Sequence, residues 1–96
     1  MQPQIENEER ESLARGIEIL PQHMQDGVRL YLDKGVKPGS FLTAVLSNNL
    51  VEAFKTADVT NIMNMQRWAT WLYNDCPVGA WGSLDKVESW IRAQSE

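Results

Sequence analysis

The longest hydrophobic pattern in the chain lies between residues 38 and 57, with the sequence PGSFLTAVLSNNLVEAFKTA. Apolar residues recur there at spacings of three and four, which predicts one long helix over about residues 40–57. The first half is apolar around nearly its whole circumference, as expected of a helix that other elements surround. A break near Asn48 and Asn49 would fit the pattern, because both residues are poor helix formers. The stripe facing the core would comprise Leu42, Leu46, Leu50, Ala53, Phe54 and Ala57.

Four other segments have the period of a helix, at residues 6–20, 21–34, 58–74 and 83–92. Gly35 should end the second of these in a left-handed conformation, and Ser40, Asp58 or Thr60, and Ser83 should begin the later helices as N-caps. In the fourth helix the expected core face comprises Ile62, Met65, Ala69, Leu72 and Tyr73, with Trp68 beside it.

No segment alternates between apolar and polar residues over the length of a strand. The pattern therefore predicts an all-α fold, a compact single-domain bundle of four to five helices around the central helix at about 40–57. Residues 1–5 are expected to be loose, and residues 6–96 to form the domain. A chain of 96 residues supports one hydrophobic core.

Charge excludes one large class of partner. The net charge is −4, and residues 1–18 hold five acidic residues against two basic ones, so the rest of the chain is close to neutral. Nucleic-acid binding is unlikely, because it needs clustered lysine and arginine. No apolar run approaches membrane length and no leader peptide is recognisable. With a single cysteine, Cys76, these features predict a cytoplasmic protein without membrane association.

The residues that could perform catalysis are few. His23 is the only histidine, and it is expected to be a partly exposed polar residue. Cys76 follows a helix C-terminus, where the dipole raises the pKa of a thiol, so it is expected to be a packing residue. No residues have metal-ligand spacing, and there is no phosphate loop or dinucleotide fingerprint. We therefore expect a protein that is not an enzyme and has no catalytic residue, metal or cofactor.

A possible protein-binding surface lies on the fourth helix. Met63, Arg67 and Trp71 follow one another at spacings of four, on the side opposite the expected core face. Arg67 could lie over Trp71 as a cation–π pair. Methionine, arginine and tryptophan outside the core are typical of binding hot spots. The alternative is that another helix covers the row. Trp81, in a glycine-containing loop, is a second candidate, or else a plug that holds the last helix.

Polar residues in and beside the central helix offer an alternative site for a small ligand. Lys37 and Ser40 lie at a helix start, where anions bind. Asn49 borders the core stripe of the central helix, Asn48 lies beside Ala44 and Val51, and Asn61 enters the fourth helix on its core side. A buried amide must be satisfied by a hydrogen bond. We favour structural roles for Asn48, Asn49 and Asn61, as caps and cross-links of the third and fourth helices. The alternative is a pocket for a nucleotide, formed by Lys37, Ser40, Asn48, Asn61 and Trp81.

Residues 19–92 resemble a family of short, mostly uncharacterised proteins of bacteriophages, prophages and their bacterial hosts. The resemblance rests on Leu20-Pro21-x-His23-Met24, Gly27, Tyr31, Gly35-x-x-Pro38-Gly39-Ser40-Phe41-Leu42, Ala44-Val45-Leu46-x-Asn48-x-Leu50, Ala57-Asp58, Asn61, Trp71-Leu72-Tyr73, Pro77 and Trp81-Gly82-Ser83. Asn49 stands where members often have an acid.

The resemblance implies an accessory role at the host interface and no known reaction. We expect a non-enzymatic protein that binds a host protein in the bacterial cytoplasm, plausibly to antagonise host defence. Binding of a small signalling nucleotide is the alternative, and an enzyme comes third. A homo-oligomer is also possible.

Overall fold

The computed structural model describes residues 16–96. The predicted loose start at residues 1–5 and the part of the predicted helix at 6–15 lie outside the described residues. At residues 16–20 the helix prediction is wrong: Gly16 has a φ of 80°, and only a 3-10 turn, η1 (Ile17–Ile19), follows it. A left-handed residue cannot belong to a right-handed helix, and a Cβ at Gly16 would overlap Asp75.

Within residues 16–96 the structure is helical and contains no strand, which confirms the predicted all-α fold. The helices are α2 (Gln22–Lys34), α3 (Ser40–Leu46), α4 (Leu50–Thr56), α5 (Val59–Met63), α6 (Met65–Asn74) and α7 (Leu84–Ser95), with a second 3-10 turn, η2 (Val78–Ala80). Gly35 ends α2 with a φ of 67°, and Asp58 and Ser83 cap α5 and α7, as predicted. Ser40 is not a cap: Gly39 has that position, and Ser40 is the first residue of α3.

The predicted central helix at 40–57 is two helices. Asn48 adopts a left-handed conformation with a φ of 61°, which ends α3. Asn49 then begins α4, and its Oδ1 accepts a hydrogen bond from the Glu52 backbone N–H at 3.2 Å. The predicted helix at 58–74 also breaks, at Asn64 between α5 and α6. Both breaks therefore fall at asparagines.

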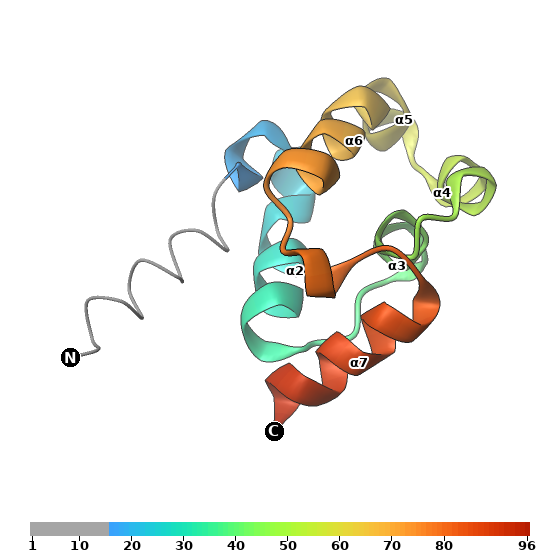
Figure 1. The fold of residues 1–96 in the computed structure, drawn as a ribbon. Helices are drawn as coiled ribbons and strands as arrows, with labels where there is room; N and C mark the ends of the chain where they lie inside the picture. Colours follow the sequence, from blue (N-terminus) through green and yellow to red (C-terminus); the bar gives the residue numbers. More distant parts are fainter. Residues whose placement is uncertain (1–15) are drawn as a thin grey trace.

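Helix α7 joins the parts of the chain that are distant in sequence. It packs against α2, α3 and η2, and crosses below them in Figure 1. The Trp90 Nε1–H donates to the Tyr31 backbone oxygen at 3.1 Å, while the Tyr31 hydroxyl donates to the Ala80 oxygen at 2.7 Å. The Gly82 N–H donates to the Leu46 oxygen at 2.7 Å. These bonds fix the segment after α6 against α2 and α3.

An aromatic cluster forms the centre of the core. Trp68 packs edge-on against Phe41, with ring centroids 5.3 Å apart, and against Trp71 at 6.1 Å. Phe41, Ala44 and Val45 are all buried, so the first half of the predicted central helix is surrounded as expected. Other expected core residues are exposed, namely Leu50, Phe54, Ile62, Ala69 and Tyr73. Leu50 and Phe54 lie after the break at Asn48, Ile62 lies just before the break at Asn64, and Ala69 and Tyr73 lie after it in α6. Beyond each break the helical phase differs from that of an unbroken helix.

Candidate functional site

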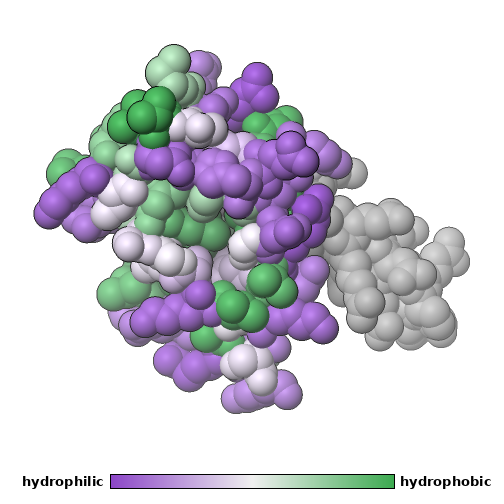
Figure 2. Space-filling view, turned by 180° about the vertical axis from the view of Figure 1, so that it is seen from behind, coloured by the Kyte–Doolittle hydropathy of each residue, from purple (hydrophilic) through white to green (hydrophobic). Residues whose placement is uncertain are grey.

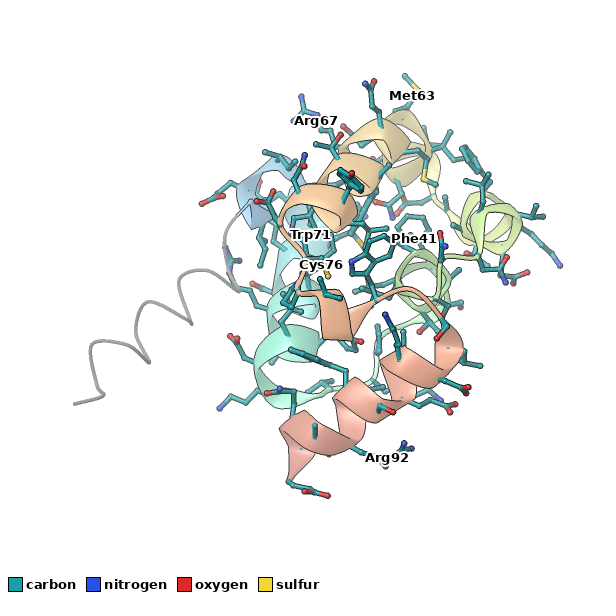
Figure 3. The ribbon with its side chains drawn as sticks, in the orientation of Figure 1. Phe41, Met63, Arg67, Trp71, Cys76 and Arg92 are labelled. Atoms are coloured by element: carbon teal, nitrogen blue, oxygen red, sulfur yellow. The ribbon has the colours of Figure 1, made fainter. Side chains whose placement is uncertain are left out.

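The row of Met63, Arg67 and Trp71 does not form one outer surface. Trp71 is fully buried, at 0% exposure, so its predicted outward orientation is wrong. Figure 3 shows Met63 and Arg67 at the outer edge of the molecule and Trp71 inside it. The reason is that α6 begins anew at Met65, after the break, and turns its two tryptophans inward. A tryptophan buries more apolar area than the residues at the predicted core positions Ile62 and Ala69.

The remaining candidates of that surface are separate from one another. Met63 is 77% exposed. The Arg67 Nη1–H donates to the Ile19 backbone oxygen at 3.3 Å, which draws the guanidinium toward η1. Trp81 is half-buried and packs against the core, as in the plug interpretation. Partner binding by Met63, Arg67 and Trp81 stays a prediction.

An apolar groove lies where α6 faces α3 and α4, with a volume of about 330 Å³. We call it the α4–α6 groove. One side of the groove is formed by Leu50 and Phe54 of α4, and Leu72 of α6 lies on the other side. The lining also includes Val45 of α3 and Trp68 of α6. Asn48, a member of the predicted ligand set, also lines this groove. The groove has the volume of a small ligand or peptide site.

Helix α4 leaves most of its apolar surface in contact with solvent. Ala53 is its one buried residue, whereas Leu50 is 67% and Val51 76% exposed. Figure 2 views the molecule from behind, with α4 and α5 at the left and upper left, and shows hydrophobic residues at the surface of this end among hydrophilic ones. This end of the molecule combines an apolar groove with an apolar rim.

A second, more polar pocket lies between α2, the start of α3 and the start of α5, with a volume of about 310 Å³. We call it the His23–Asp58 pocket. The His23 Nε2 lies 2.9 Å from Asp58 Oδ2, and Asp58 Oδ1 accepts from the Asn61 backbone N–H at 2.8 Å. The backbone hydrogen bond from Asn61 is the main reason why the pKa of Asp58 is lowered, and His23 lowers it further. Other lining residues include Met24, Ser40, Phe41 and Leu42.

Asn61 is a buried polar residue, with 2% exposure, and it lines the same pocket. Its Oδ1 accepts a hydrogen bond from Trp68 Nε1 at 3.2 Å. This bond links α5 to α6 and places the central indole. The structural role that we expected for the asparagines is therefore present at Asn61, and also at Asn49, which caps α4.

The alternative ligand set predicted from the sequence is not one site. Ser40 and Asn61 share the His23–Asp58 pocket, while Lys37 lies in a neighbouring hollow that Ser40 also borders. Asn48 faces the α4–α6 groove, and Trp81 lines neither pocket. The structure instead adds His23 and Asp58 to Ser40 and Asn61. Sequence reasoning identified His23 as partly exposed and Asp58 as a cap, but a contact across 35 residues has no local signal.

Cys76 is buried, and burial raises the pKa of its thiol to about 12. This agrees with the packing role expected for it. Within residues 16–96, no three or more His, Cys, Asp or Glu side chains gather as they would around a metal ion. The helices of the same part of the chain include none that is long and apolar enough to cross a membrane.

Comparisons of the chain with protein-family models, curated proteins and solved structures gave no match. The candidate sites therefore rest on the geometry described above.

Proposed function

We propose that this chain is a non-enzymatic binding protein that takes a partner protein in the α4–α6 groove. The observation that carries this proposal is the exposure of Leu50 and Phe54 along a groove whose other residues are mostly apolar. Monomeric proteins rarely expose contiguous apolar patches larger than a few hundred Å² to water. Exposed patches above that size typically mark interaction sites. A partner that covers these side chains gains about 25 cal/mol for each Å² of apolar surface removed from water.

The occupant that fits the groove best is the apolar face of a helix. Two helices, α4 and α6, border the groove, and α3 also contributes lining residues to it. An amphipathic helix binds such a groove with side chains at positions i, i+3 or i+4, and i+7. Glu52 and Lys55 on α4 provide one charge of each sign, so the partner needs no strong net charge. A partner of this kind would bury the apolar side of α4 that is otherwise exposed to solvent.

The resemblance to phage and prophage proteins supports a bacterial host protein as the partner, in the host cytoplasm. Antagonism of host defence would then follow from blocking a surface that the host protein needs. Catalysis has less support, because His23 and Asp58 form a pair but no hydrogen bond joins Ser40 to His23 among the described residues. A histidine base acts on a nucleophile within hydrogen-bond reach.

The test is capture of a partner by a groove variant and by a surface control. Leu50→Glu with Phe54→Glu places charges at the groove, and Tyr73→Glu places one at a position that is 83% exposed and outside the groove. We expect the parent and Tyr73→Glu to retain the same host protein after crosslinking in a bacterial lysate, and the double variant to lose it. Light scattering after gel filtration identifies self-association. Equal capture by all three proteins would contradict the proposal.

A further inference from the structure

We propose that the His23–Asp58 pocket binds a neutral, planar heterocycle that presents an N–H beside a C=O, as the pairing edge of a uracil-type base does. This inference does not depend on the α4–α6 groove, which lies elsewhere on the molecule. It also differs from the anion site expected at Lys37, because the pocket's lining within the described part of the chain includes no lysine or arginine.

The pocket has a hydrogen-bond donor without a partner. The indole Nε1–H of Trp68 can only donate, so the atom of Asn61 that it meets is the oxygen. The other terminal atom of the same carboxamide is therefore the nitrogen, Nδ2, and it makes no hydrogen bond to a described residue. Asn61 lies at the wall of the pocket with only 2% exposure. Nδ2 is not among the fully enclosed side-chain atoms that lack a partner, so it keeps some exposure, and a ligand carbonyl can reach it and accept its hydrogen bond.

The pocket also has an acceptor, Asp58, which lies three residues before Asn61 at the start of α5. Asp58 caps the helix to which Asn61 belongs, and its two oxygens each accept one hydrogen bond, from His23 Nε2 and from the Asn61 backbone. An ionised carboxylate has lone pairs for about four hydrogen bonds, so Asp58 can still accept one from a ligand N–H. Donor and acceptor therefore match a ligand edge on which C=O and N–H are neighbours.

The rest of the pocket fits the faces and size of a single ring system. Met24, Phe41 and Leu42 contribute apolar surface, and the volume of about 310 Å³ is at the small end for ligand sites. The carboxylate of Asp58 disfavours a phosphate, since like charges repel. A nucleoside therefore fits the pocket better than its 5′-phosphate.

The test uses probes that differ in one group. Uridine should shift the side-chain amide signals of Asn61 in a ¹H–¹⁵N NMR titration of the full chain. 3-Methyluridine, in which a methyl group replaces the N–H, should bind at least tenfold more weakly. Uridine 5′-monophosphate should bind no more tightly than uridine. Equal binding of uridine and 3-methyluridine, or shifts confined to residues outside the pocket, would overturn the proposal.

A pair of variants provides a protein-side check. Asp58→Asn keeps a good N-cap, so the fold should persist, but it places an amide donor where the ligand needs an acceptor. Asp85→Asn makes the same change of charge at an exposed residue in the first turn of α7. We expect uridine binding to fall at least tenfold in Asp58→Asn and to stay unchanged in Asp85→Asn, with both melting curves measured. Unchanged binding in a folded Asp58→Asn protein would contradict the role of Asp58.

Discussion

Trp71 carries an unsatisfied polar group in the core. Its Nε1–H has no hydrogen-bond partner among residues 16–96, although the ring is fully buried. An unpaired buried donor costs about 1–3 kcal/mol, so the packing of the ring against Trp68 and its other neighbours must offset this cost. The contribution of Trp71 to the molecule is therefore packing rather than hydrogen bonding or partner contact.

Trp71→Ala should lower the free energy of unfolding by about 3–5 kcal/mol, the range for truncation of a buried aromatic side chain. Trp71→Phe should cost less, because it removes the unsatisfied N–H and keeps a ring. Urea unfolding followed by circular dichroism measures both. Tyr73→Ala, at an exposed position two residues further on, should stay within about 0.5 kcal/mol of the parent. A stable Trp71→Ala protein would place this ring at the surface after all.

The stability of the fold at low pH should depend on the hydrogen bonds of Asp58. The pKa of Asp58 is lowered in the folded protein, chiefly by the Asn61 N–H, so its ionised form stabilises the fold above the unfolded-state pKa of about 3.9. This stabilisation is lost as the pH falls toward the lowered pKa. Between about pH 5 and about pH 2.5 the parent should lose more stability than Asp58→Asn. Identical pH profiles for the parent and Asp58→Asn would contradict the assignment.

The break between α3 and α4 determines which apolar residues remain exposed. Ser47 to Asn49 are not helical, and Asn48 has a positive φ. Helix α4 therefore leaves the direction of α3 and packs against it through Ala53. In one continuous helix Leu50 and Phe54 would extend the stripe of Leu42 and Leu46. The α4–α6 groove is a consequence of this change of direction.

Asn48→Gly and Asn48→Val should therefore have opposite effects. Glycine adopts a φ of 61° without a steric cost, so Asn48→Gly should be as stable as the parent or slightly more stable. Valine in a left-handed conformation should cost about 1–2 kcal/mol. Chemical unfolding measures both, and Val51→Gly, inside α4, should by contrast lower the stability, because glycine is a poor helix former. If Asn48→Val were fully stable, the helix would be continuous through this turn.

The sequence predicted the helical class, the span of α2, the left-handed end at Gly35 and the surrounded start of α3, because each depends on residues close in the chain. It did not predict the exposed apolar side of α4, because the spacing of four from Leu46 to Leu50 continues the stripe across the break. The burial of Trp71 was missed for a similar reason, because Asn64 restarts the helix; Trp68 was expected beside the core face and is buried. The His23–Asp58 contact depends on how distant helices pack.

At the scale of the whole molecule, α7 and the segment before it connect the parts of the core. The backbone oxygen of Ile91 lies so close to Gly35 that a Cβ there would be 2.6 Å from it. Together with the bonds from Tyr31 to Ala80 and from Gly82 to Leu46, this contact links the ends of α2 and α3 to the C-terminal part of the chain. Unfolding of the C-terminal part of the chain should then require unfolding of α2 and α3 as well.

The accessibility of Cys76 tests this cooperativity. The thiol is 7% exposed and burial raises its pKa to about 12, so an aromatic disulfide reagent should react with it only when the segment opens. If opening is global, the natural logarithm of the labelling rate should rise linearly with urea, and its slope multiplied by RT should equal the m-value from circular dichroism. Gly35→Ala should lower the free energy of unfolding, because the added methyl group meets the Ile91 oxygen, and RT times the natural logarithm of the labelling rate should rise by the same amount. A labelling rate that is fast in water and independent of urea would instead show that the segment from Asp75 to Ser83 opens locally, without α2 and α3.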